Sequence, residues 1–144
     1  MRTTRNIAAV FLLAAAVAPV TSLAMMPWPR KGIADVPNGV AAPFVGHWSM
    51  EQDGRPATVY ATCKLPVRIR AADDTHIFYE GPKDREAEAA TQLVARDGRT
   101  HWEPIAGGPR YFTVWVHPDR FHLYEAEVEA EIDWGEPYAF TRCD

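Results

Sequence analysis

From Phe44 onward, short runs of alternating apolar and polar residues are separated by residues that favour turns. In VRIRA (67–71), for example, two branched apolar residues alternate with two arginines. This period of two places successive side chains on opposite faces of a β-strand. Turn signals such as QDGRP, AADDT, ARDGR and HPDR lie between the runs. The pattern therefore predicts an antiparallel meander of short strands.

Strand edges expose unpaired backbone groups, so many short strands in one small domain need closure or a second covering sheet. We therefore expect an all-β fold, a small antiparallel up-and-down barrel of eight or nine strands, with a β-sandwich as the alternative. The expected strands cover residues 45–52, 57–63, 66–71, 75–80, 88–96, 99–104, 110–117, 120–131 and 136–143.

Two segments leave a short helix open as an alternative. Residues 84–96 are rich in helix formers, and residues 126–132 carry apolar side chains at a spacing that also suits a helix. For residues 120–132 we favour a strand, because HPDR predicts a hairpin turn at its start. A helix would also stack neighbouring glutamates, at a cost of about 0.2–0.5 kcal/mol per pair.

Two different segments precede the meander. Residues 1–24 combine Arg2 and Arg5 with an apolar run too short to cross a bilayer and with small residues at its end, which is typical of a cleaved secretory signal. Residues 25–43 are rich in proline and predict an extended, loosely held arm. Residues 44–144 then form one barrel domain. We expect secretion, into the periplasm, with no membrane insertion after signal cleavage.

The chain is acidic. Its net charge is −4, and removal of Arg2 and Arg5 with the signal would make the charge more negative. Nucleic acids and anionic membranes attract proteins with basic surfaces. The composition therefore argues against a nucleic acid or a membrane surface as the partner.

Two cysteines occur in the whole chain, Cys63 and Cys143. A secreted chain with an even number of cysteines usually pairs them, so we expect a disulfide that ties the last strand to the middle of the domain. Neither a CxxC pattern nor the four-ligand spacing of a structural zinc site is present. Thiol chemistry is therefore not expected.

The first expected strand contains VGHW, in which Gly46 and Trp48 form a GxW motif. This motif resembles the opening of lipocalins and other calycin barrels. In that family the tryptophan closes one end of the barrel and an arginine from a late strand packs across it. The resemblance implies these roles for Trp48 and Arg142. The combination of export signal, GxW and two spaced cysteines also resembles small secreted proteins of unassigned function from Gram-negative bacteria.

Few residues could support catalysis. Ser49 is the only serine after residue 24, and no GxSxG-type elbow surrounds it. We therefore expect a protein that is not an enzyme and uses no cofactor. His117 and His122 flank the predicted hairpin turn and could meet across it as metal ligands. We favour two surface histidines without a metal, because no third ligand is evident.

Aromatic residues recur through the expected strands, where they either fill the core or line a cavity for a small apolar ligand. We favour filling. If the interior does hold a cavity, Trp48, Trp102 and Trp115 are the candidates to line it.

YEAEVEAEID (124–133) alternates apolar and acidic side chains. On a strand it would display Glu125, Glu127, Glu129 and Glu131 on one face, about 7 Å apart, which is too far for neighbours to share a calcium ion easily. Such a ladder suits a basic protein surface. The leading interpretation is a secreted, non-catalytic binding module, inhibitor-like toward a basic protein partner. The alternative is a carrier of a small apolar ligand in the barrel interior.

Overall fold

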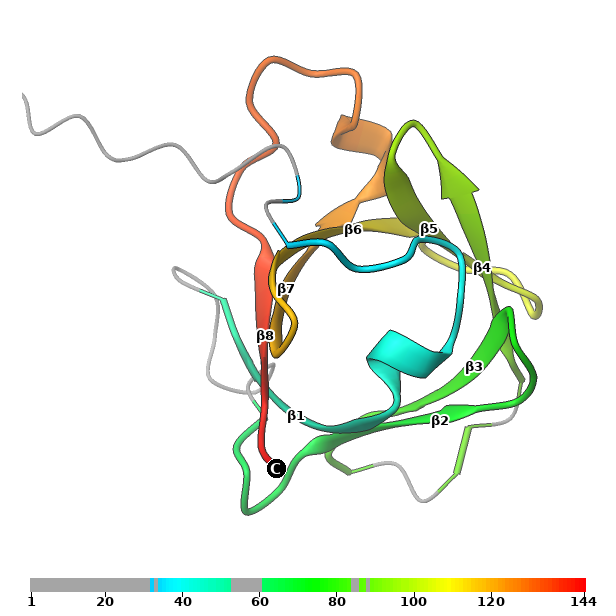
Figure 1. Ribbon diagram of the computed structural model, residues 1–144, viewed down its shortest axis with the longest axis vertical. Helices are drawn as coiled ribbons and strands as arrows, with labels where there is room; N and C mark the ends of the chain where they lie inside the picture. Colours follow the sequence, from blue (N-terminus) through cyan, green and yellow to red (C-terminus); the bar gives the residue numbers. More distant parts are fainter. Residues whose placement is uncertain (1–31, 33, 53–60, 84–85, 88) are drawn as a thin grey trace, which may run out of the picture.

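A computed structural model of the chain describes residues 32, 34–52, 61–83, 86–87 and 89–144. The strands among these residues pair antiparallel in chain order, and the last strand pairs with the first, which closes a barrel of eight strands (Figure 1). The prediction of an all-β up-and-down barrel is confirmed. The strands are β1 (Gly46–Glu51), β2 (Val67–Ala71), β3 (His76–Glu80), β4 (Thr91–Arg96), β5 (Arg99–Pro104), β6 (Tyr111–His117), β7 (Arg120–Glu125) and β8 (Tyr138–Arg142).

The expected strand positions agree with most of these bounds. The bounds of β5 are the predicted ones. For residues 84–96, where a helix was left open as an alternative, the part 91–96 is a strand. The expected signal at 1–24 and most of the expected strand at 57–63 lie outside the described residues. From that strand, Ala61 and Thr62 form isolated bridges to Met50 and Leu65.

Inward-facing side chains from several strands build an aromatic core. Phe121 and Phe140 stack with ring centroids 4.6 Å apart, and Trp48 packs edge-on against Phe121 at 4.8 Å. Phe44, fully buried, contacts Trp115 at 4.9 Å. These rings fill one half of the barrel, which we call the closed end. The short turns after β2, β4 and β6 lie at this end.

The segment before β1 seals the closed end. Figure 1 shows it crossing the ring of strands, with the 3-10 helix η1 (Ala42–Phe44) inside the ring. The N–H of Gly39 donates to Thr100 Oγ1 at 2.9 Å, and the N–H of Ala41 donates to the Asp74 carbonyl at 2.8 Å. The expectation of a loosely held arm is therefore wrong for this part, because backbone hydrogen bonds fasten it to the turns of the barrel.

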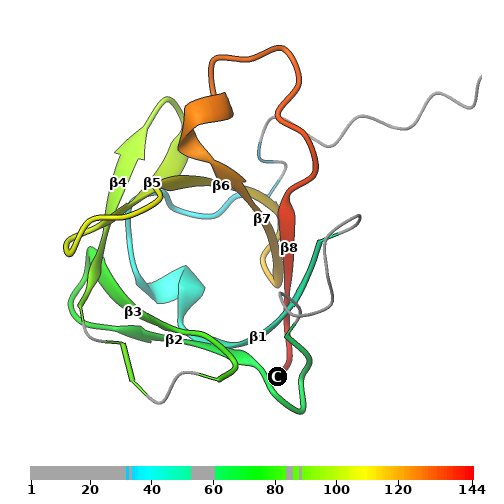
Figure 2. The same ribbon diagram turned by 180° about the vertical axis from the view of Figure 1, so that it is seen from behind.

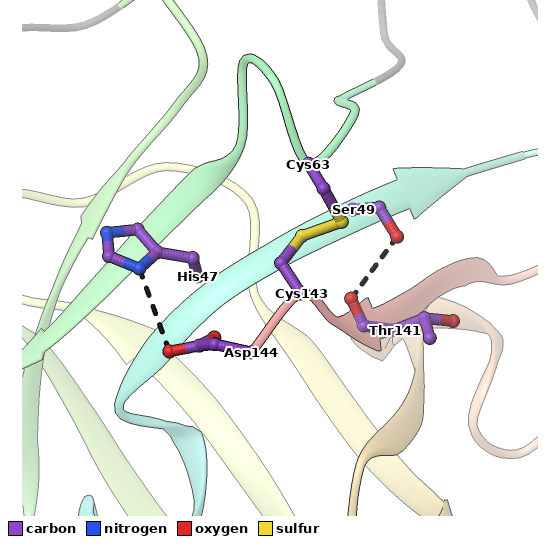
Figure 3. The surroundings of a disulfide bond; sticks show 6 residues. All are labelled: His47, Ser49, Cys63, Thr141, Cys143 and Asp144. Atoms are coloured by element: carbon purple, nitrogen blue, oxygen red, sulfur yellow. Dashed lines mark hydrogen bonds and ion pairs between the residues drawn. A yellow bond between two sulfur atoms is a disulfide. The ribbon is translucent and has the colours of Figure 1, made fainter.

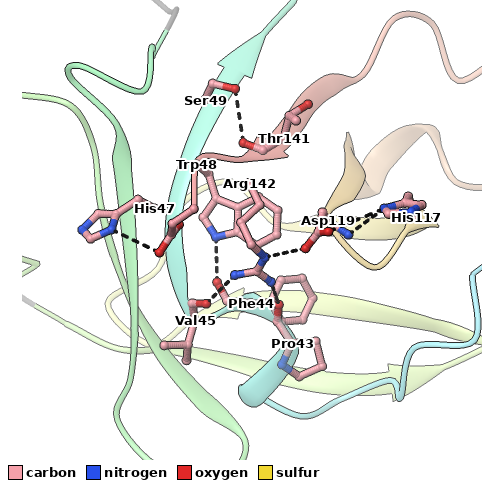
Figure 4. Close-up of polar contacts among 11 residues, drawn as sticks. Pro43, Phe44, Val45, His47, Trp48, Ser49, His117, Asp119, Thr141 and Arg142 are labelled. Carbon is pink, nitrogen blue, oxygen red and sulfur yellow. Dashed lines mark hydrogen bonds and ion pairs between the residues drawn. The ribbon is translucent and has the colours of Figure 1, made fainter.

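Arg142 of β8 joins the sealing segment to the core (Figure 4). Its guanidinium carbon lies 4.2 Å from the centroid of the Trp48 ring. Two guanidinium nitrogens donate to the carbonyls of Pro43 and Val45, each at 2.8 Å, and Nε donates to Asp119 Oδ1 at 2.9 Å. One cation thus contacts three separate segments.

Gly46 is required by the same arrangement. Its φ of 143° lies in a region that side chains with a Cβ rarely adopt. A Cβ at this position would also stand 2.6 Å from Arg142 Nη1. Within the GxW motif, Trp48 therefore contacts the guanidinium and Gly46 leaves room for it.

A disulfide stands beside the seam where β1 meets β8 (Figure 3). Cys63 and Cys143 are bonded, with 5.4 Å between their Cα atoms, as the even cysteine count predicts. Next to the bond, the N–H of Cys143 donates to the His47 carbonyl at 2.9 Å, and Ser49 Oγ donates to the Thr141 carbonyl at 3.2 Å.

The strand predicted for 120–131 ends early, at Glu125. Residues Ala126–Val128 form a 3-10 turn (η3), and the chain then folds back outside the ring of strands, as both views show (Figures 1 and 2). The expected extension over 126–131 is therefore wrong. The alternating sequence favours a strand here. Contacts of Glu129 and Trp134 with the barrel wall stabilise the turn and the returning chain instead.

Those contacts form an outer cluster of Arg99, Phe112, Tyr124, Glu129 and Trp134. Glu129 Oε1 accepts a 2.9 Å hydrogen bond from Arg99 Nη1, whose guanidinium carbon lies 4.7 Å from the Trp134 ring centroid. The Trp134 ring meets Phe112 edge-on at 4.9 Å. An ion pair stacked on aromatic rings thus holds the returning chain against the barrel wall.

A second charged group lies on the outer face of β2 and β3. Glu80, 1% exposed, accepts hydrogen bonds from Arg68 Nε and, at 2.9 and 2.8 Å, from Arg70. The Arg70 hydrogen bond, followed by that of Arg68, lowers the pKa of Glu80 below its ordinary value of 4.5, against the opposing effect of burial. The folded state therefore holds Glu80 in its charged form.

Replacing Cys63 and Cys143 together by alanine should lower the free energy of unfolding. The bond spans a sequence separation of 80, for which the chain-entropy model gives about 4.5 kcal/mol. Urea denaturation at neutral pH, followed by tryptophan fluorescence, would measure the loss. A loss of less than about 1 kcal/mol would contradict the expectation that loop closure matters here.

Stability should fall on acidification because of Glu80. A carboxyl whose folded pKa is depressed stabilises the fold above its unfolded pKa, here near 4.5, and loses that contribution as the pH falls through the folded pKa. Glu80→Gln should therefore destabilise the protein most at pH 7 and progressively less below pH 4.5, as measured by urea denaturation across this range. Glu51→Gln, at an exposed strand position, is the control. An equal effect of Glu80→Gln at all pH values would contradict the assignment.

Candidate ligand-binding site

The end of the barrel opposite Arg142 is organised differently, and we call it the open end. The connections after β1, β3, β5 and β7 begin at this end, and they contain more residues than the turns at the closed end. No segment comparable to η1 is inserted at this end among the described residues. Within this described part, side chains from the strand ends surround the barrel axis without a plug between them.

A cavity of about 350 Å³ occupies this half of the interior. Seven of the eight strands or their connections contribute to its wall, so the cavity is central to the barrel. The described residues that line it are Met50, Tyr79, Thr91, Trp102, Pro104, Pro109, Tyr111, Leu123, Tyr138 and Phe140. Its volume falls within the range of roughly 300–1,000 Å³ that is typical of small-molecule sites.

The cavity has a buried floor and a more accessible rim. Trp102, Leu123 and Phe140 are at most 5% exposed and continue directly into the aromatic core. Tyr111 and Tyr138, half-buried, face each other edge-on at the rim with ring centroids 6.4 Å apart. The floor is therefore fixed by core packing, whereas the rim consists of side chains nearer to solvent.

Strand alternation explains why these side chains point inward. Tyr79 follows the inward Ile77 by two positions in β3, and Tyr138 precedes the inward Phe140 by two positions in β8. On β4, Thr91 faces the cavity and its neighbour Gln92 is exposed. The register Thr91↔Pro104 between β4 and β5 brings both residues to the same part of the wall.

Polar groups in the wall are few and neutral. The hydroxyls belong to Thr91 and to the three tyrosines, and Tyr79 donates its hydroxyl toward Met50 Sδ at 4.0 Å. No acidic or basic side chain is among the described residues that line the cavity. The wall can therefore accept apolar surface and one or two hydrogen-bonding groups.

The three tryptophans proposed for a ligand cavity are divided by the structure. Trp102 lines the cavity. Trp48 and Trp115, whose ring centroids are 6.2 Å apart, belong to the packed half of the interior next to Phe44. The interior is thus filled at the closed end and hollow at the open end.

Sequence reasoning did not name Tyr79 or Tyr111 as candidates to line a cavity. Tyr111 shares an inward-facing set with Thr113 and Trp115 in the alternation of β6, and this was the signal that could have identified it. Alternation shows which face of a strand points inward, but it does not show how far along the barrel axis a residue lies. It therefore could not predict which end of the barrel holds the cavity.

The histidines considered for metal binding do not meet. The register of the β6–β7 hairpin pairs His117 with Arg120 and His122 with Val114. His117 is exposed and its Nδ1 accepts the N–H of Asp119 at 3.1 Å. His122 is buried on the outer face, where burial and, to a lesser degree, Arg120 lower its pKa to about 4. Within the described residues, no group of three His, Cys, Asp or Glu side chains could hold a metal ion.

The four glutamates proposed as a partner surface do not form a ladder. Glu125 closes β7, Glu127 lies in η3, and Glu131 is exposed in the chain that follows. Glu129 is engaged by Arg99 and lies 3.3 Å from Nε2 of the buried His101. Binding of a basic partner through these residues stays a prediction, without the continuous charged strand on which it was based.

His101 is the other buried titratable group near this cluster. Arg96 Nη2 donates to its Nδ1 at 2.9 Å, and its Nε2 lies 3.3 Å from Glu129 Oε1. Burial is the main cause that lowers the pKa of His101. The side chain belongs to the outer wall and does not line the cavity, so it is a structural group of the outer cluster.

Among the described residues, no helix is both long enough and apolar enough to cross a bilayer. Comparisons of the chain with protein-family models, with curated proteins and with solved structures found no match. The fold and the geometry of the cavity are therefore the evidence from which a function is argued.

Proposed function

We propose that this protein binds a small apolar ligand in the open half of its barrel. The observation that carries the proposal is the 350 Å³ cavity, which is lined mainly by apolar and aromatic side chains and by no charged one among the described residues. A single-domain protein of this size normally packs its interior closely. A cavity of this volume next to a densely packed aromatic core is therefore better explained as a ligand site than as loose packing.

Burial of apolar surface supports the same function. A ligand that buries ~200 Å² of apolar surface gains about 5 kcal/mol from the hydrophobic effect. This gain is reduced by the loss of ligand freedom and by ordering of side chains. Trp102 and Phe140 are already fixed by the core, so the ordering cost falls mainly on the rim.

The compartment belongs to the same proposal. A disulfide between Cys63 and Cys143 suits an oxidising environment, and residues 1–24 have the composition of an export signal. We infer that the protein carries or sequesters its ligand outside the cytosol, without catalysing a reaction on it.

Filling part of the cavity should weaken binding. Thr91→Phe places a ring inside the wall and should weaken binding of the neutral fluorescent probe N-phenyl-1-naphthylamine on the order of tenfold or more. Fluorescence titration would measure this, because the probe brightens in apolar surroundings.

The matched control is Gln92→Phe, which adds the same ring one residue away on the exposed face of β4. Far-UV circular dichroism would establish that both variants fold, and Thr91→Leu replaces Thr91→Phe if the larger ring prevents folding. Equal probe binding by the wild type and the filled variant would rule out the interior as the site.

A further inference from the structure

The charge distribution around the cavity is the first guide to its ligand. Three acidic residues stand directly beside lining residues in sequence: Glu51 after Met50, Glu80 after Tyr79 and Glu103 after Trp102. Strand alternation sends all three to the outer face, where Glu51 is exposed, Glu80 pairs with Arg70, and Glu103 lies 3.6 Å from Arg96 Nη1. These charges thus lie outside the barrel wall.

No described residue that lines the cavity carries a charge that could neutralise a charged group there. Phenol and alcohol hydroxyls can donate or accept a hydrogen bond, but they supply no opposite charge. Transfer of an ionised carboxylate or ammonium group from water into such surroundings is strongly unfavourable without a paired counter-charge. The wall therefore discriminates against ions of either sign.

The arrangement of rings is the second guide. Five of the ten described lining residues are aromatic: Tyr79, Trp102, Tyr111, Tyr138 and Phe140. Tyr79 meets Trp102 and Phe140 edge-on at 6.1 and 6.5 Å, and the two rim tyrosines meet each other in the same way. Edge-to-face packing leaves some ring faces directed away from their neighbours. A planar ligand gains attractive contacts with such rings beyond the area that it buries.

We propose, on the basis of the ligand-binding function above, that the cavity selects an uncharged aromatic ligand that carries a single polar group. The rings of Trp102 and Phe140 contact the ligand at the floor. A hydroxyl of Thr91 or of a rim tyrosine hydrogen-bonds its polar group. Fatty acids and other amphiphilic anions are excluded as the preferred class.

Three competitors of matched size test this selection. With N-phenyl-1-naphthylamine as the reporter, the wild-type protein at neutral pH is titrated with 2-naphthamide, with 2-naphthoate and with undecanamide. The first two share one ring system and differ in charge. The first and third share the amide and the number of carbon atoms and differ in aromaticity. Probe fluorescence is assigned to the cavity only where Thr91→Phe removes it and Gln92→Phe retains it. Displacement is measured on this part of the fluorescence.

We expect 2-naphthamide to displace the probe at concentrations on the order of tenfold lower than either competitor. Equal or better displacement by 2-naphthoate would overturn the selection for an uncharged ligand, and equal displacement by undecanamide would overturn the selection for an aromatic one. Failure of all three to displace a bound probe would overturn the ligand class while leaving the cavity as a site. Absence of any probe signal sensitive to Thr91→Phe would overturn the ligand-binding function itself.

Discussion

The contact between the Arg142 guanidinium and the Trp48 ring is the interaction on which the rest of the barrel depends. A cation over an aromatic face is attractive, and more so where the group is partly shielded from water. The same guanidinium donates to the carbonyls of Pro43 and Val45, which flank the buried Phe44 of the sealing segment. Because β8 supplies the arginine and β1 the tryptophan, this contact joins the first and last strands at the point where the sheet closes.

The hollow half of the barrel follows from this seal. Phe44 enters the interior from the sealing segment and supplies an aromatic plug for the closed end. No described residue plays the same part at the other end, where Tyr111 and Tyr138 stand at the rim. In the part of the chain that the structure describes, the two ends thus differ because one receives an inserted segment and the other does not. The asymmetry sets both the position and the depth of the cavity.

The fold was largely predictable because it depends on local patterns. Period-two alternation and turn residues gave the strands, and the even cysteine count gave the disulfide. The failure at residues 126–131 has a different cause. There, Glu129 forms an ion pair with Arg99, and Trp134 packs on Phe112. These partners are distant in sequence, so local periodicity cannot predict the contacts. The cavity was partly predictable, since Trp102 was named, but its tyrosines depend on depth along the barrel, which pairing register determines.

The disulfide beside the β1–β8 seam also bears on how a bound molecule could come and go. In an up-and-down barrel the first and last strands meet at a seam, and separation of these strands would open the wall. Here hydrogen bonds, the Arg142 contacts and the covalent link between Cys63 and Cys143 hold the seam together. For the proposed ligand-binding function, the open end beside Tyr111 and Tyr138 is therefore a route into the cavity that leaves this seam closed.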